Sequence, residues 1–223
     1  MKLLTANYTN QSAIWPEKGR HILAQYDADS IVVYQAYRPE IGHYAAEHGY
    51  FGGAFSLNRM SWIKPNFLWM MYRCGWGTKQ GQEVTLAVRM CRTGFDTIIA
   101  RAVPSTCWPH RFDSPAQWKA AGAASDVRLQ WDPDHGPYGE MLERRAIQLG
   151  LRGETLASYA REWIIEIEDI SEFVAEQHRL IKNGNVDDLK TPKEHVYQID
   201  DQRIATQIGL FGESSGHEDS PSA

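Results

Sequence analysis

Residues 59–76 constrain the fold of this chain more than any other stretch of its sequence. They hold three of the eight tryptophans, three of the six methionines and three basic residues, and no acidic residue. Residues 67–72 are apolar on every side of a helix, which is typical of a helix buried on most of its surface. The stretch therefore predicts a core helix, flanked by cations, with one wall facing an anionic ligand.

Pro65 fits the first position of this helix, because its φ is fixed near the helical value and the first turn needs no N–H group from it. The sequence predicts an extended segment over residues 59–64 and a helix over residues 65–73 that ends before Gly75. Lys64 is a poor N-cap, so the first N–H groups of the predicted helix stay unpaired. Free N–H groups behind Lys64 and Arg59 are an arrangement that binds phosphate or carboxylate groups. The alternative is that both cations are solvated or ion-paired.

Trp62, Trp69 and Trp76 recur every seven residues, but Pro65 and Gly75 interrupt any single helix that would join them. We expect most of these rings to lie in the core and one or two at most to stack on a ligand.

Alternation of apolar and polar residues predicts strands over residues 31–37, 83–92, 126–132, 144–151 and 163–168. Helices are predicted over residues 39–48, 96–102, 115–121 and 170–182, a polar loop over 132–137 and an edge strand over 197–199. The chain shows no repeat and no long linker, so we expect one domain over residues 1–210. Residues 211–223 have little to bury and predict a disordered tail.

Two amides stand out on predicted strands. Gln35 lies on an otherwise apolar strand, so it either bonds within the protein or faces a ligand. Gln148 lies between Ala146 and Gly150, and these small neighbours leave room for something to lie against the sheet. The alternative for Gln148 is a satisfied side chain on an ordinary half-exposed strand.

The charge of the chain argues against a global nucleic-acid surface, because the net charge is −5 and the pI is about 5.9. The distribution is uneven, however: residues 59–92 carry six Lys or Arg against one Glu, and residues 154–200 carry eleven acidic residues against five basic ones. A local anion site is compatible with this pattern. The three cysteines have no metal-ligand or disulfide-framework spacing, and no window approaches the ~18 apolar residues of a membrane span. These features predict a cytoplasmic protein with no metal and no membrane partner.

Four segments, residues 31–37, 59–76, 130–133 and 147–151, together resemble the DUF4291 family, a domain of unknown function, over about residues 15–176. The order of elements is also similar to that of the ADP-ribosyltransferase superfamily. This second resemblance implies an α+β fold with a mostly antiparallel, split β-sheet, flanking helices and NAD lying across the sheet.

The superfamily carries a polar or basic residue on its first strand, a Ser, Thr or Tyr on its second, and a Glu or Gln on a later strand. The resemblance places Gln35 or Arg38, Ser61 and Gln148 at these positions. An amide at Gln148 can bond a ribose hydroxyl but supplies no negative charge. Either another acid carries the chemistry, with Glu140, Glu143 and Asp132 as candidates, or the protein binds without turnover.

The sequence thus predicts an NAD-binding, ADP-ribosyltransferase-like protein that transfers ADP-ribose to a nucleic acid or a protein. The catalytic residues would be Gln148, Gln35 and Ser61, and the NAD-binding residues would be Arg38, Arg59, Trp62, Lys64, Tyr72, Arg73, Trp76 and Lys79. One alternative is a non-catalytic nucleotide- or RNA-binding module that uses the same cations and aromatic rings. Another is a structural or partner-binding domain whose tryptophans and methionines are core residues only.

Overall fold

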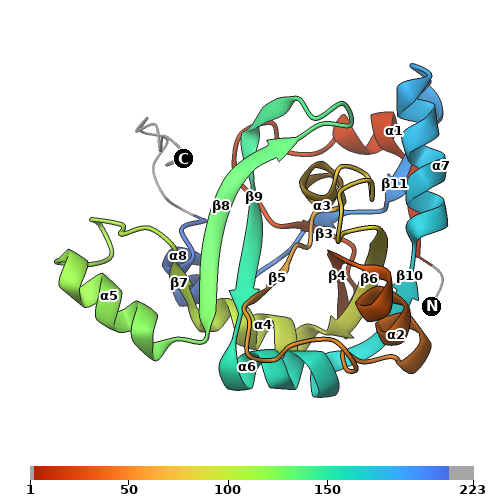
Figure 1. Ribbon diagram of the computed structural model, residues 1–223. Helices are drawn as coiled ribbons and strands as arrows, with labels where there is room; N and C mark the ends of the chain where they lie inside the picture. The colour runs from red at the N-terminus through yellow and green to blue at the C-terminus, as the bar shows by residue number, and fades with distance from the viewer. Residues whose placement is uncertain (1–2, 211–223) are drawn as a thin grey trace.

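Two β-sheets form the framework of the protein, which we describe from a computed structural model over residues 3–210 (Figure 1). The smaller sheet is antiparallel and has the order β10-β6-β4, with strands β4 (Ser30–Tyr37), β6 (Val84–Cys91) and β10 (Ile164–Asp169). The larger sheet has the order β2-β9-β8-β7, and β5 also pairs with β9; its strands are β2 (Gly19–Arg20), β5 (Ser61–Ile63), β7 (Ala102–Pro104), β8 (Val127–His135) and β9 (Met141–Leu151). Only the β2–β9 and β7–β8 pairs of this sheet are parallel.

Residues 61–64 join the two sheets. β5 pairs antiparallel with the end of β9, so that Trp62 lies opposite Gly150. The next residue, Lys64, exchanges backbone hydrogen bonds with Tyr34 of β4, at N···O distances of 2.7 and 3.2 Å. Pro65 follows and has no N–H group to continue the pairing. The sheets therefore share one short segment and diverge on either side of it (Figure 1).

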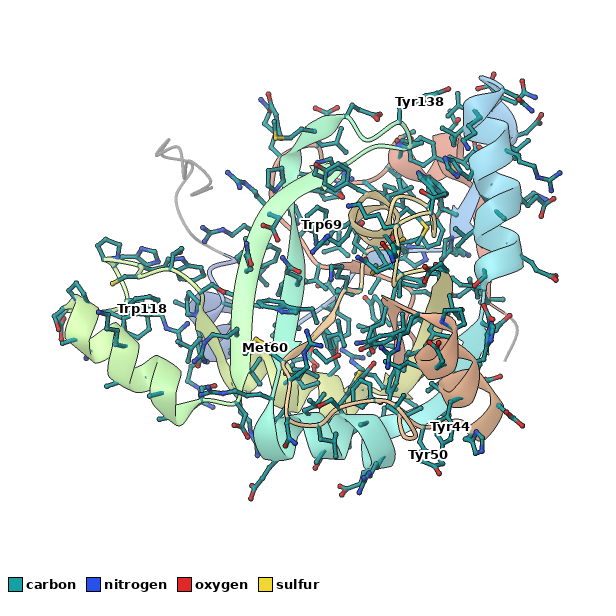
Figure 2. The ribbon with its side chains drawn as sticks, in the orientation of Figure 1. Tyr44, Tyr50, Met60, Trp69, Trp118 and Tyr138 are labelled. Atoms are coloured by element: carbon teal, nitrogen blue, oxygen red, sulfur yellow. The ribbon has the colours of Figure 1, made fainter. Side chains whose placement is uncertain are left out.

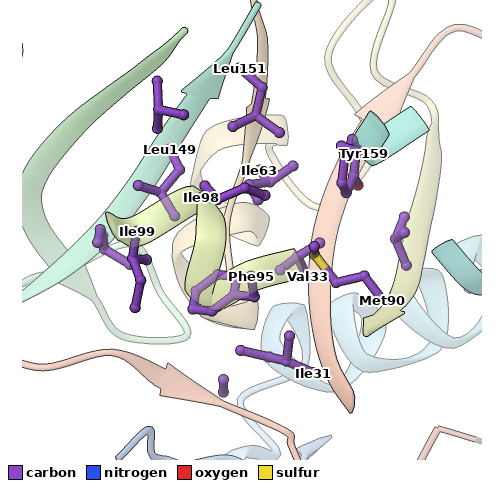
Figure 3. Packing of buried hydrophobic residues seen from close by; sticks show 14 of the residues in the cluster. Ile31, Val33, Ile63, Met90, Phe95, Ile98, Ile99, Leu149, Leu151 and Tyr159 are labelled. Carbon is purple, nitrogen blue, oxygen red and sulfur yellow. The ribbon is translucent and has the colours of Figure 1, made fainter. Parts of the chain in front are cut away.

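The main hydrophobic core fills the space between the diverging sheets. Figure 3 shows Ile63, Leu149 and Leu151 of the larger sheet packed with Val33 and other residues of the smaller sheet and of α4 (Arg92–Ala100). The helix α6 (Gly153–Ser158) and the π-helical turn η1 (Tyr159–Trp163) close one end of this core. A second, smaller core lies on the other face of β4, under α3 (Phe67–Cys74) and α7 (Ser171–Lys182).

The remaining elements lie around this framework. Two small antiparallel pairs join the chain ends to the body: β1 pairs with β11, and β3 pairs with β12. The elements are β1 (Thr5–Asn7), α1 (Tyr8–Ser12), β3 (Leu23–Ala24), α2 (Pro39–His48), α5 (Pro115–Ala124), the 3-10 turn η2 (Val186–Asp188), β11 (Lys190–Pro192), β12 (His195–Val196) and α8 (Gln202–Gln207). In Figures 1 and 2, α5 projects from the body and carries Trp118. No helix within residues 3–210 has the length and apolar character needed to cross a bilayer.

The prediction of an α+β domain with mostly antiparallel strands is confirmed, and the helix over residues 39–48 has the predicted bounds. The predicted loop over 132–137 is wrong, because β8 continues to His135 and β9 begins at Met141, so that the hairpin turn is confined to the residues between them. The edge strand predicted over 197–199 is instead β12 at His195–Val196. The helical segments α6 and η1 were not predicted, and η1 brings the fully buried Tyr159 into the core. The predicted tail over 211–223 lies outside the described residues.

Substitution of Ile63 tests whether residues 61–64, which join the two sheets, contribute to the hydrophobic core. Ile63 is fully buried between the sheets, whereas Ile165 of β10 is a strand residue of the same type that is 57% exposed. Ile63→Ala should lower the free energy of unfolding by ~2–5 kcal/mol, because it removes buried methyl groups and leaves a cavity. Ile165→Ala should change it by less than about 0.5 kcal/mol. Urea denaturation of both variants measures the difference, and equal losses would contradict the assignment of the core.

Candidate functional site

A cavity of about 720 Å³ opens where the two sheets diverge. Its volume lies within the roughly 300–1,000 Å³ typical of small-molecule sites. Side chains reach the cavity from both sheets, from α3 and from the loop before β6; the strands that contribute are β4, β5, β8 and β9. No Asp or Glu is among the lining residues. These residues are Gln35, Ala36, Tyr37, Arg38, Ile41, Ala54, Phe55, Ser56, Arg59, Met60, Ser61, Trp62, Lys64, Met70, Arg73, Gly81, Gln82, Gln130 and Gln148.

Lys64 is the most deeply placed cation of the cavity. The residue is 4% exposed, whereas every other lysine within residues 3–210 is exposed. No hydrogen bond or ion pair within the described part of the chain reaches its Nζ atom. Burial lowers the pKa of Lys64 to about 8, and the positive charge of Arg73 acts in the same direction. A substantial fraction of this amine is therefore neutral slightly above physiological pH.

Arg38, Arg59 and Arg73 supply the other positive charges that line the cavity. Arg38 pairs with the exposed Glu40, with an N···O distance of 3.3 Å. The guanidinium groups of Arg59 and Arg73 form no hydrogen bond or ion pair with any residue that the structure describes. Because the lining contains no carboxylate, these charges are available to an anionic ligand.

A network of polar side chains surrounds Gln35. Its Nε2 donates to Tyr37 Oη and to Ser61 Oγ, both at 2.8 Å, and Tyr159 Oη donates to its Oε1 at 2.7 Å. The Tyr37 and Ser61 hydroxyl groups lie 2.6 Å apart, so one hydrogen bond joins them. Each hydroxyl carries one hydrogen, so one hydroxyl donates to the other and the second hydrogen has no acceptor among the described residues; Tyr37 and Ser61 both line the cavity. Gln35 is thus fully bonded within the protein and positions the two hydroxyl groups.

Asp132 lies behind the cavity wall and is held by two amides. Gln130 Nε2 donates to Asp132 Oδ1 at 2.9 Å, and Gln148 Nε2 donates to Asp132 Oδ2 at 2.8 Å. Burial raises the pKa of Asp132, while the two hydrogen bonds and the charge of Lys64 oppose that shift. With both amide nitrogens engaged, the Oε1 atoms of Gln130 and Gln148 are acceptors without a partner among residues 3–210. The amides therefore present neutral acceptors to a ligand.

Asp132 is the one of the three candidate acids that lies at this wall. Glu140 accepts a hydrogen bond from the Tyr138 N–H group in the hairpin turn, and Glu143 pairs with the exposed Lys18. Asp132, by contrast, bonds directly to the lining residue Gln148.

The N-terminus of α3 corrects the prediction of a free phosphate-binding helix end. The helix begins at Phe67 rather than at Pro65, and Asn66 is its N-cap: Asn66 Oδ1 accepts from the Trp69 N–H group at 2.7 Å. Glu194 Oε1 accepts from the Phe67 N–H group, also at 2.7 Å. Two side chains of the protein thus occupy the place that the sequence assigned to a phosphate.

Eight of the eleven predicted site residues line the cavity: Gln35, Arg38, Arg59, Ser61, Trp62, Lys64, Arg73 and Gln148. Tyr72, Trp76 and Lys79 do not. Tyr72 stacks on His135 with ring centroids 3.5 Å apart, and Trp76 stacks on His178 at 5.6 Å. Lys79 Nζ donates to the Arg73 carbonyl oxygen at 2.8 Å. All three lie outside the lining because they belong to other faces of α3 or to the turn after it.

The space over Gly150, which the sequence associated with a ligand, is filled by the protein itself. A side chain at Gly150 would meet Met60 Sδ at 2.7 Å and the Trp62 ring at 3.0 Å. Figure 2 shows Met60 beside β9 at this point. Gly150 therefore makes room for β5 and not for a ligand. Trp62 of β5 lines the cavity.

Sequence reasoning missed Tyr37, Met70 and Gln130 as lining residues. Tyr37 follows Gln35 by two positions on β4, so strand alternation places both on one face. Met70 precedes Arg73 by three positions and shares its helical face. Gln130 lies opposite Gln148 across the β8–β9 hairpin, and this pairing follows only from the register.

In a comparison with known protein families, the chain matches a family model described as "Domain of unknown function (DUF4291)" over residues 21–197. No curated protein matches the chain. The matched segment includes every lining residue of the cavity.

Glu194 predicts a pH dependence of folding stability. The residue is 1% exposed, and burial raises its pKa well above the ordinary value of 4.5. Its contribution to stability is complete below the unfolded-state pKa and falls as pH rises through the folded-state pKa, because the unfolded chain then releases a proton that the folded chain retains. Glu194→Gln keeps an acceptor for the Phe67 N–H group but cannot ionise. The free energy of unfolding of the wild type, relative to Glu194→Gln, should therefore decrease between about pH 5 and about pH 8 in urea titrations.

The exposed Glu143 serves as the control for this experiment, because Glu143→Gln removes an acid from the same chain at a surface ion pair. Its stability difference from the wild type should show no comparable decrease with pH. A constant difference between the wild type and Glu194→Gln would contradict the assignment of a buried, protonated carboxyl group.

Proposed function

This chain belongs to the DUF4291 family, and we propose that its central cavity binds NAD and that the protein transfers ADP-ribose to an acceptor. The observation that carries the proposal is the charge of the cavity: Arg38, Arg59, Lys64 and Arg73 line about 720 Å³, with no acidic side chain among the lining residues. A pyrophosphate carries two negative charges and suits such a group of cations, since guanidinium groups bond its oxygens in pairs.

The other lining residues suit the remaining parts of the NAD molecule. Trp62 and Phe55 offer partly exposed rings on which a base or the nicotinamide could stack. Gln148 Oε1 is an acceptor for a ribose hydroxyl, and the free hydrogen of the Tyr37 and Ser61 pair is a donor for an amide oxygen. The divergence of the two sheets is also the arrangement that an ADP-ribosyltransferase-like fold would require, and we include that fold relationship in the proposal.

In the proposed reaction, the bond between the nicotinamide nitrogen and ribose C1′ breaks, and nicotinamide leaves with the electron pair. An acceptor nucleophile forms a bond to C1′ and releases its proton. Positive charge develops at C1′, where a nearby carboxylate is stabilising. Gln148 would hold the ribose, and Asp132 would supply negative charge from behind it. Gln35 would act as a positioning residue for Ser61.

A non-catalytic nucleotide- or RNA-binding module is the second candidate function. The observation that favours it is the place of Asp132, whose carboxylate is bonded to Gln130 and Gln148 and is not among the lining residues. The exposed Arg38, Arg59 and Arg73 would then contact phosphates, and binding to RNA would weaken steeply with salt. Binding of NAD without release of nicotinamide would favour this function over transfer.

Lys64 predicts the pH dependence of NAD binding. With a pKa of about 8, its ammonium form loses its proton as pH rises from about 7 to about 9, and the cavity loses one positive charge. If the bound pyrophosphate requires that charge, the apparent affinity should fall about tenfold over this range, in proportion to the protonated fraction. Isothermal titration calorimetry at both pH values measures the change. Lys64→Arg keeps its charge and should bind with nearly constant affinity. Absence of binding by the wild type at millimolar NAD would refute the proposal.

Asp132 tests the transfer step separately from binding. Asp132→Asn removes the negative charge behind Gln148, so the rate of nicotinamide release should fall by about a hundredfold. Glu143→Gln, at another of the three candidate acids, should leave the rate unchanged, because Glu143 pairs with Lys18 at the surface. Chromatography of nicotinamide released from NAD gives both rates. Equal rates for Asp132→Asn and the wild type would exclude this carboxylate from the reaction.

A further inference from the structure

Lys64 differs from the other three cations of the cavity in both its burial and its chemistry. Arg38, Arg59 and Arg73 are exposed residues with permanently charged guanidinium groups, whereas Lys64 is 4% exposed. Burying a charge without a partner is costly. An amine, unlike a guanidinium group, loses its proton when it is buried and then has a free electron pair.

The surroundings of Lys64 leave that electron pair unused. No residue within 3–210 forms a hydrogen bond or an ion pair with Nζ, although the residue lines the cavity. Its backbone is fixed on both sides, by the hydrogen bonds to Tyr34 and by the pairing of the preceding strand β5 with β9. Lys64 therefore combines a fixed backbone with an amine that has no partner among the described residues. It lines a cavity whose other charged residues are arginines.

Asp132 is the acidic side chain whose charge acts on this amine. The two side chains influence each other electrostatically: each favours the charged form of the other. They do not form an ion pair, however, since no N···O distance of 4.0 Å or less joins them among the described residues. Asp132 does not line the cavity, but it accepts a hydrogen bond from Gln148, which does, and burial holds the carboxyl group nearer to its protonated form.

We propose that Lys64 is a nucleophilic amine that forms an imine with a phosphorylated aldehyde or ketone bound in the cavity. This inference rests on the cavity being an anion site, as in the proposed function, but it does not require that the anion be NAD. The arginines hold the phosphate, and the carbonyl carbon lies at Lys64 Nζ.

The chemistry balances without an oxidant or a reductant. The neutral amine attacks the carbonyl carbon, a C–N bond forms, and the proton that the nitrogen loses passes to the carbonyl oxygen. The hydroxyl group of the resulting carbinolamine takes a proton from solvent and leaves as water, and the nitrogen returns a proton to solvent as the C=N bond forms. One amine and one carbonyl compound thus give one imine and one water molecule.

Pyridoxal 5′-phosphate is a suitable probe, because it carries an aldehyde and a phosphate on one small molecule. The full-length protein is incubated with it at about pH 8 and reduced with sodium borohydride, and the modified lysines are identified by peptide mass spectrometry. Lys64 should be modified at least about tenfold faster than the exposed Lys79, because Lys64 lines the cavity beside the arginines and burial lowers the pKa of its amine to about 8. Inorganic pyrophosphate should protect Lys64 by competing for the arginines, without protecting Lys79.

Three variants separate the amine from the anion site. Lys79→Arg should keep the adduct at Lys64. Arg73→Met should slow its formation about tenfold, because one phosphate contact is lost. Lys64→Arg should lose the adduct while still binding pyrophosphate in calorimetry; if this variant fails to fold, protection of the wild type by pyrophosphate decides the question.

Labelling of Lys64 no faster than that of the exposed lysines would overturn the proposal, and so would labelling that pyrophosphate does not slow. Failure of NAD to bind, together with a protected adduct at Lys64, would refute the proposed function and leave this inference intact. Binding of NAD without a Lys64 adduct would support the proposed binding of NAD and refute this inference.

Discussion

The backbone hydrogen bonds of residues 61–64 are the constraint on which the rest of the structure depends. This segment pairs with β9 through β5 and with β4 through Lys64, so it fixes where the two sheets meet and where they part. Successive side chains of an extended segment point to opposite sides. Ile63 consequently enters the core, while Trp62 and Lys64 on the opposite side line the cavity; Ser61, at the start of β5, also reaches the lining. The same alternation that builds the core thus supplies the site.

The positive character of the cavity is preserved by the way its neighbouring acid is placed. Asp132 accepts hydrogen bonds from the amides of Gln130 and Gln148. This carboxyl group is thus satisfied by neutral N–H donors and not by the cations that line the cavity. The arginines therefore face the open space without internal ion pairs that would compete with a ligand, apart from the exposed contact of Arg38 with Glu40.

The sequence predicted the parts of this arrangement that have local signals. Strand alternation located β4, β6, β8 and β9, and the unusual composition of residues 59–76 located Arg59, Lys64 and Arg73 at one site. The capping of α3 by Glu194 could not be predicted, because the two bonded residues are 127 positions apart and nothing near Glu194 marks it. Tyr72 lies outside the cavity lining for a different reason: the rotation of 100° per residue puts Arg73 and Met70 on one face of α3 and turns Tyr72 away from it. Gln130 pairs with Gln148 because of the register of the β8–β9 hairpin. This register shifts at a bulge between Pro133 and His135, and no residue pattern in the sequence predicts the bulge.

Glu194 also connects the central helix to both ends of the described chain. Its side chain accepts from α3, its backbone N–H group donates to Gln11 Oε1 at 2.9 Å, and Trp15 Nε1 donates to its carbonyl oxygen at 3.0 Å. One buried residue thus couples the anchoring of the N-terminal segment to the start of α3, although the three segments are far apart in the sequence. A local opening at this residue would release both contacts at once, so the two segments should behave as one cooperative unit.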